Sequence, residues 1–169
     1  HAGLTGKNII EQLCNIPVNV DIASEFRYRN PIIDKNTLCI YISQSGETAD
    51  TIAALKLSKS KGATTIAISN VIGSSITREA DYSIYTHAGP EIAVASTKAY
   101  TSQIILLDIL AIYFAEILES TSSEKINKIK KEILSLPPKI EETLKCSSEV
   151  KKFAKKMYQE NDVFFLGRG

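Results

Sequence analysis

Apolar and β-branched runs alternate with segments of helical periodicity along most of this chain. Each apolar run is short and ends in a polar turn, which is typical of a buried strand leaving a sheet. The connections between the runs are too long for hairpins, so the pattern predicts a parallel sheet covered by helices on both faces. The predicted strands are residues 18–23, 37–42, 63–69 and 82–86, with one more at 162–166.

Helical spacing of apolar positions predicts helices between and after these strands. Pro137 and Pro138 are expected to break the last helical stretch, because proline cannot continue the backbone ladder. Residues 104–118 are strongly apolar, but Asp108 and Glu116 interrupt them. Since about 20 consecutive apolar residues are needed to span a bilayer, we expect a buried or dimer-facing helix there. The predicted helices are residues 1–13, 47–60, 74–80, 94–118, 122–136, 140–145 and 148–159, with a short helix and a surface loop in 24–36.

The order of these elements divides the chain into three parts. Residues 1–120 form an αβα unit, residues 121–160 a helical connector, and residues 161–169 the first strand and turn of a second unit. Because the chain starts without a methionine and stops within a turn, we expect it to be truncated at both ends. Ligands of parallel sheets bind outside the carboxyl ends of the strands, where Ser43 and Ser69 would lie.

Composition narrows the range of partners. The 169 residues suffice for about one domain with a sizeable core, and 44% hydrophobic with 23% charged residues is ordinary for a globular protein. A formal net charge of +1 gives no reason to expect nucleic acid or a membrane surface as a partner. Tryptophan is absent, so no stacking platform for bases is suggested.

Cysteine and histidine spacing predicts neither a metal site nor a disulfide framework. Cys14, Cys39 and Cys146 are far apart and odd in number, and His1 and His87 have no cysteine or histidine neighbours. We therefore expect a protein from a reduced, cytoplasmic compartment, without a metal site.

Residues 43–48, Ser-Gln-Ser-Gly-Glu-Thr, carry the strongest chemical signal. A strand, a tight turn and a helix start aim backbone N–H groups and the positive end of the helix dipole at one point, which suits phosphate. A helix cap with a turn glycine is the plainer interpretation, but four polar side chains exceed what capping needs. Glu47 would repel a phosphate unless its side chain turns away. The four polar side chains are those of Ser43, Gln44, Ser45 and Thr48.

Residues 88–99 form a second candidate segment. A Gly-Pro turn is followed by small residues that would let the backbone approach a ligand, and Ser96 could bond a sugar hydroxyl. A capped helix with small residues for tight packing explains the segment as well. We interpret Glu91 as an acid of the first helical turn, Lys98 as a solvated or ion-paired lysine and His87 as structural. No catalytic triad or pair of carboxylates can be assembled from the sequence, so the binding groups are visible and catalytic groups are not.

These segments resemble the isomerase part of the glutamine–fructose-6-phosphate aminotransferase family, also called glucosamine-6-phosphate synthases. Residues 43–51 and 91–100 carry the resemblance most closely. Residues 23–29, 73–75 and 165–169 match the same family in the right order. The first motif alone would indicate only a SIS (sugar isomerase) domain, whereas the set together points to this family.

The resemblance implies a three-layer αβα sandwich with a parallel, flavodoxin-like sheet of five strands, the SIS fold, and makes residues 1–120 the first SIS domain. The family opens fructose 6-phosphate, adds ammonia from glutamine and isomerises the adduct to glucosamine 6-phosphate, without a metal or redox cofactor. Its glutaminase domain and catalytic side chains would lie outside residues 1–169. The resemblance thus implies that the protein is a homodimer. It also implies that residues 1–169 bind fructose 6-phosphate or glucosamine 6-phosphate but do not turn it over. The implied substrate-binding residues are Ser43, Gln44, Ser45, Thr48, Val94 and Ser96.

Two alternatives remain open. If the chain is a sugar-phosphate-sensing SIS domain of a transcriptional regulator, we expect a DNA-binding domain elsewhere in the protein. Residues 137–166 instead lead into a second unit, which favours the enzyme. Another SIS-type isomerase or deglycase of amino-sugar phosphates would share the first turn. Residues 88–100 argue against it.

Overall fold

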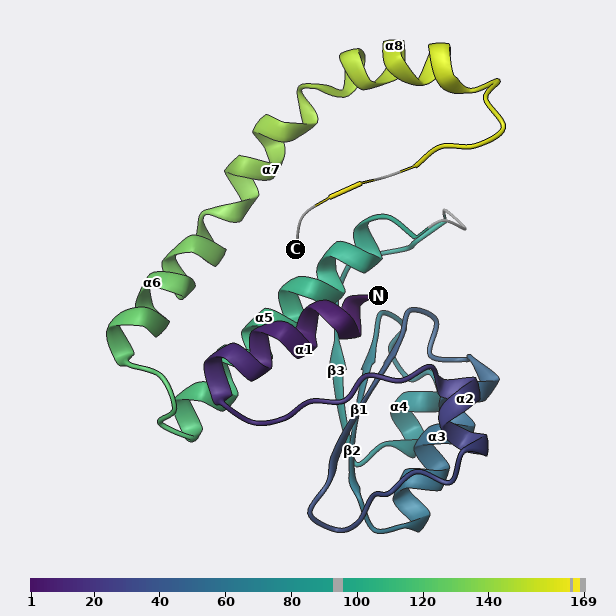
Figure 1. Ribbon diagram of the computed structural model, residues 1–169, viewed down its shortest axis with the longest axis vertical. Helices are drawn as coiled ribbons and strands as arrows, with labels where there is room; N and C mark the ends of the chain where they lie inside the picture. The colour runs from purple at the N-terminus through teal and green to yellow at the C-terminus, as the bar shows by residue number, and fades with distance from the viewer. Residues whose placement is uncertain (93–95, 165, 168–169) are drawn as a thin grey trace. The chain divides into compact units, whose positions relative to one another are not determined.

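The computed structural model describes residues 1–92, 96–164 and 166–167. Within them, three strands form a parallel sheet in the order β1-β2-β3, as Figure 1 shows. The strands are β1 (Leu38–Ser43), β2 (Thr64–Ser69) and β3 (Tyr82–Tyr85). Their last residues pair in register at the carboxyl edge, Ser43 with Ser69 and Ser69 with Tyr85. The turns that follow the three strands therefore begin at the same edge of the sheet.

The chain divides into two compact units, His1–Ser123 and Glu124–Gly169, and the sheet belongs to the first. On one side of the sheet lie three helices (Figure 1): α2 (Ala23–Tyr28), α3 (Ala49–Ser60) and α4 (Ser75–Glu79). Tyr41, Leu55 and Ile76 are buried there. Burial of side chains as large as Leu55 or Ile76 stabilises the fold by about 1.5–3 kcal/mol each. The Tyr41 hydroxyl donates to the Ala54 carbonyl oxygen at 3.0 Å, so its polar end has a partner.

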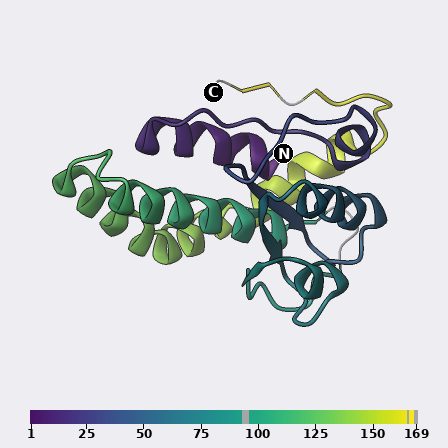
Figure 2. The ribbon, with the colours of Figure 1, turned by 90° about the horizontal axis from the view of Figure 1, so that it is seen from below.

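The other face is covered by α1 (Ala2–Cys14) and α5 (Lys98–Ile117), which lie side by side in Figures 1 and 2. Leu107 of α5 packs with Ile68 of β2 in this second core. A Cβ at Gly6 would lie 2.9 Å from a Leu107 methyl carbon, so glycine lets the two helices approach closely. Helices thus cover both faces, and the predicted α/β class with a parallel sheet is confirmed.

Among the described residues, α5 is the one helix that length and apolar composition would allow to cross a membrane. Core helices of soluble proteins meet the same criteria. Leu107, Leu110 and Ala111 of α5 are buried within the first unit, whereas Ile109, Tyr113 and Ile117 are exposed, so one face of the helix packs on the sheet. The helix begins at Lys98 rather than at residue 94, and residues 94 and 95 of the expected helix lie outside the described ones.

The second unit is helical. Its helices are α6 (Ser123–Leu134), which starts at the boundary, α7 (Leu136–Leu144) and α8 (Ser147–Met157). The predicted break of the helical stretch at Pro137 and Pro138 is seen, because α6 ends at Leu134 and α7 begins at Leu136. Its predicted position between the helices was wrong, since both prolines lie in the first turn of α7. Proline is tolerated there, since the first helical N–H groups have no intrahelical partner and the ring presets a helical φ.

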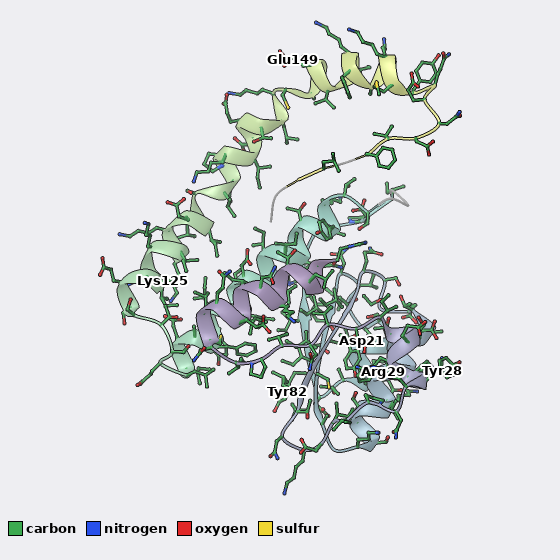
Figure 3. All side chains as sticks on the ribbon, viewed as in Figure 1. Asp21, Tyr28, Arg29, Tyr82, Lys125 and Glu149 are labelled. Atoms are coloured by element: carbon green, nitrogen blue, oxygen red, sulfur yellow. The ribbon has the colours of Figure 1, made fainter. Side chains whose placement is uncertain are left out.

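The strand predicted at 18–23 is also wrong. Residues 18–22 are irregular and α2 begins at Ala23. The backbone N–H of Val18 donates to a Glu11 carboxylate at 3.0 Å, and that of Ile22 to Asp21 at 2.9 Å. Side-chain acceptors thereby replace the ladder that a strand would need. Asp21 also forms an ion pair with Arg29 beside α2 (Figure 3).

The remaining expected strands are not seen in the described parts of the chain. Residues 162–164 and 166 are not in a strand, and Phe165 of that prediction lies outside the described residues. A strand needs a neighbour for its backbone hydrogen bonds, and the sheet pairs only β1, β2 and β3. The described sheet therefore has three of the five strands that the resemblance implied.

Candidate functional site

The β1–α3 turn, residues 43–48, is folded by its own hydroxyl groups. The Ser43 Oγ is buried, accepts from the Gly46 N–H at 3.0 Å and shares a hydrogen bond of 3.0 Å with the Thr48 Oγ1. The Ser45 Oγ accepts from the Glu47 N–H at 3.2 Å. One hydroxyl hydrogen is used between Ser43 and Thr48, which leaves the second hydroxyl hydrogen of the pair for an outside acceptor. Since Thr48 is exposed, it is the member of the pair that a ligand can reach.

The N-terminus of α3 opens directly from this turn. Thr48 is its N-cap residue, but no side chain caps the helix, because the Thr48 hydroxyl bonds Ser43 instead. The first N–H groups of a helix carry partial positive charge and lack intrahelical partners. A helix N-terminus without a side-chain cap, next to a hydroxyl hydrogen that is not used within the turn, is suited to bind an anion such as phosphate.

Gly46 lets the β1–α3 turn pack closely against the turn that follows β2. Its φ of +69° is left-handed, and a Cβ there would lie 2.1 Å from the Ser74 Oγ and 2.8 Å from the Ser69 Oγ. Its carbonyl oxygen accepts from the Ile76 N–H at 3.0 Å. Only glycine meets both the backbone and the packing requirement.

Both acids near the turn are directed to other partners. The Glu47 carboxylate accepts from the Ser75 N–H at 2.8 Å, at the start of α4, and hydrogen bonds from Ser75 lower the pKa of Glu47 below its ordinary 4.5. Asp50, in the first turn of α3, pairs with the Arg27 guanidinium at 2.8 Å. The expected conflict between Glu47 and a bound phosphate is thereby removed, since the side chain turns away.

Gln44 is held by its backbone. Its carbonyl oxygen accepts from the Asn70 N–H at 3.1 Å, and the side chain is half-buried. Within the described residues the side-chain amide of Gln44 makes no hydrogen bond. It is therefore available to a ligand at the carboxyl edge.

The second candidate segment is only partly described. Val94 lies outside the described residues. Ser96 is half-buried with a left-handed φ of +46°, and no described residue of the β1–α3 turn forms a hydrogen bond with it. Glu91 accepts from the Thr97 N–H at 3.0 Å and from the Ala99 N–H at 3.1 Å, so it caps the start of α5. Glu91 itself precedes α5, whose first turn holds no acidic residue, so the prediction that it is an acid of the first helical turn was wrong.

The roles expected of His87 and Lys98 stay predictions, and both residues are exposed. The His87 ring stands edge-on to Tyr85, with 6.2 Å between ring centroids, and its backbone φ is +50°. Lys98 is exposed. Neither side chain has a nucleophile or a carboxylate as a hydrogen-bonding partner in the described structure.

The family model of the SIS domain matches residues 1–113. The chain belongs to the SIS domain family. The match spans the whole sheet, both layers of helices and both candidate segments. It confirms the SIS fold that the motifs had indicated.

The whole chain is also similar to glutamine–fructose-6-phosphate aminotransferases of other organisms. It is 60% identical to a glutamine–fructose-6-phosphate aminotransferase (isomerizing) of Clostridium tetani, over 100% of this chain and 28% of that protein. The corresponding protein of Thermococcus kodakarensis is 45% identical over 100% of this chain and 28% of its own length. The chain thus spans 28% of the length of these relatives.

A solved structure agrees with the sequence matches. The C-terminal domain of glucosamine-fructose-6-phosphate aminotransferase from Francisella tularensis superposes with a TM-score of 0.94 at 38% identity, covering 99% of this chain and 48% of that one. The resemblance to this enzyme family, drawn from the motifs, is confirmed.

Sequence reasoning missed the role of Asn70. Its side chain makes three hydrogen bonds to the loop after β3. An asparagine directly after a buried strand was a usable signal, because asparagine side chains often bind nearby backbone. Within the described residues, no group of three or more metal-ligating side chains comes together.

Proposed function

We propose that this chain is the sugar-phosphate-binding part of an enzyme that makes glucosamine 6-phosphate from fructose 6-phosphate and glutamine. One observation carries the proposal: an uncapped helix N-terminus and a hydroxyl-rich turn lie together, while both nearby acids bind other partners. The names of the most similar relatives support it.

The proposed grip uses different groups for the two ends of the substrate. The first N–H groups of α3 and the hydroxyls of Ser45 and Thr48 would bind the phosphate oxygens, with charge-assisted hydrogen bonds. Ser43 would orient Thr48 and complete the grip, and the free amide of Gln44 would bind sugar oxygens. Val94 and Ser96 would form a second wall of the sugar site.

The remaining parts of the proposal follow the domain pattern. Residues 1–120 would be the first SIS domain, residues 121–160 a helical connector and residues 161–169 the opening of a second SIS domain. The catalytic side chains would lie outside these residues, so the chain alone would bind sugar phosphate without turning it over. We further propose a homodimer in the cytoplasm, with neither nucleic acid nor membrane as a partner and without a cofactor.

Titration of the chain with fructose 6-phosphate by isothermal calorimetry tests the grip. The Ser43→Ala, Ser45→Ala double variant should bind about 1–3 kcal/mol more weakly, as expected for lost charge-assisted hydrogen bonds. Ser45→Ala alone is the milder variant, because the Ser45 hydroxyl bonds only the Glu47 N–H within the turn. Ser60→Ala, at the other end of α3, is the matched control. Unchanged affinity in both turn variants would refute the proposal.

The alternative classes make different predictions for the complete protein. An enzyme of the proposed kind would form glucosamine 6-phosphate from fructose 6-phosphate and glutamine. A sugar-phosphate sensor would bind the ligand without turnover and would bind DNA, and another SIS isomerase or deglycase would act without glutamine. Product analysis with and without glutamine separates the three.

A further inference from the structure

Asn70 lies at the middle of the carboxyl edge, directly after β2 and between the exits of β1 and β3. Its backbone N–H donates to the Gln44 carbonyl oxygen of the β1–α3 turn at 3.1 Å. Its side chain turns the other way, to residues 86–92, which we name the β3 exit loop. One residue therefore joins the proposed phosphate grip to the loop that leads toward Ser96.

The Asn70 side chain uses both ends of its amide. The Oδ1 accepts from the Ala88 N–H at 2.9 Å and from the Thr86 hydroxyl at 3.0 Å, and the Nδ2 donates to the Gly89 carbonyl oxygen at 2.7 Å. A backbone N–H can only donate and a backbone carbonyl can only accept, so these partners determine which end of the amide is oxygen. A side chain that carries only hydrogen-bond donors or only acceptors cannot replace all three bonds.

These bonds bracket a strained part of the backbone. His87 has a φ of +50°, in the left-handed region that residues with a Cβ rarely adopt, and Gly89 follows with +68°. Such conformations persist where the surrounding structure holds them. Asn70 forms hydrogen bonds with Thr86 and Ala88, on both sides of His87, and with the carbonyl of Gly89. It therefore stabilises this backbone conformation of the loop.

We propose that Asn70 is a positioning residue that fixes the β3 exit loop relative to the β1–α3 turn and thereby sets how the site receives the carbon chain of a sugar phosphate. The inference rests on the proposed function of the turn. Substitution of the side chain leaves the backbone bond to Gln44 in place, so the phosphate grip is retained while the loop is released. Asn70 acts through the loop and does not itself contact the ligand.

Two ligands separate these roles. The variants Asn70→Ala and Asn70→Asp are titrated by calorimetry with fructose 6-phosphate and with inorganic phosphate. Asn70→Ala should weaken fructose 6-phosphate binding about tenfold, and phosphate binding less than about twofold. Asn70→Asp keeps the acceptors for Ala88 and Thr86 but sets a carboxylate oxygen against the Gly89 carbonyl oxygen, so it should release the loop as well. Its negative charge should weaken the binding of both anionic ligands, so the comparison between the two ligands rests on Asn70→Ala. The control is Asn8→Ala, on the exposed side of α1.

A readout without ligand tests the loop directly. Amide hydrogen exchange at Ala88 should be faster in Asn70→Ala than in the unchanged protein, while exchange at Ile68 in β2 stays the same. Equal losses for both ligands, or unchanged exchange at Ala88, would overturn the inference. If the unchanged protein binds neither ligand, the proposed function fails, and the exchange at Ala88 still decides whether Asn70 positions the loop.

Discussion

Gly46→Ala tests how closely the β1–α3 turn is packed against the turn after β2. The left-handed φ of +69° at Gly46 costs any residue with a Cβ about 1 kcal/mol. The added Cβ would also lie 2.1 Å from the Ser74 Oγ, 2.5 Å from the Ser74 Cβ and 2.8 Å from the Ser69 Oγ. Contacts of this length cannot persist, so the backbone or the serines must move.

The expected loss is the sum of a conformational and a packing contribution. Overpacking of a close-packed region costs about 1–3 kcal/mol. With about 1 kcal/mol for the backbone, the free energy of unfolding should fall by about 2–4 kcal/mol. For a chain of this size that corresponds to a fall in melting temperature of about 4–16 °C.

The matched control is Gly73→Ala, in the neighbouring turn. Gly73 has the same φ of +69°, but nothing lies within 4 Å of a Cβ placed there. Urea denaturation should therefore show a loss of about 1 kcal/mol for Gly73→Ala and a clearly larger one for Gly46→Ala. Equal losses in the two variants would show that the serines do not restrict the turn, and the packing argument would be wrong.

Two further predictions concern the core and the charge of the site. Tyr41→Phe removes the hydroxyl that bonds the Ala54 carbonyl and the buried Ser58 hydroxyl, and should lower the free energy of unfolding in urea by about 1–3 kcal/mol; no measurable loss would contradict the assigned bonds. The pKa of Glu47 is lowered from 4.5 by hydrogen bonds from Ser75, so its contribution to stability is present above that value and is lost as the pH falls through the lowered pKa. Glu47→Gln should therefore lose less stability between pH 5 and acidic pH, measured by thermal unfolding in dilute salt, and identical acid profiles would refute this linkage.

Local pattern sufficed for most of the secondary structure. The predicted strands at 37–42, 63–69 and 82–86 agree with β1, β2 and β3 to within one residue at either end. Short apolar runs with polar ends are a local property, and strands that are buried on both faces show it clearly. The failure at residues 18–23 arises because side-chain acceptors close in the sequence, Glu11 and Asp21, bind backbone N–H groups that a sheet ladder would use.

The sequence alone determined the α/β class and the helices between the strands, because each depends on neighbours along the chain; the anion site at the turn of residues 43–48 stays a prediction. The tertiary structure decided which partners the polar side chains around this turn have. Glu47 turns to the Ser75 N–H, Asp50 pairs with Arg27, and Asn70 joins two loops. These partners lie 16–28 positions apart in the chain, and only the folded sheet brings their polar groups within hydrogen-bonding distance.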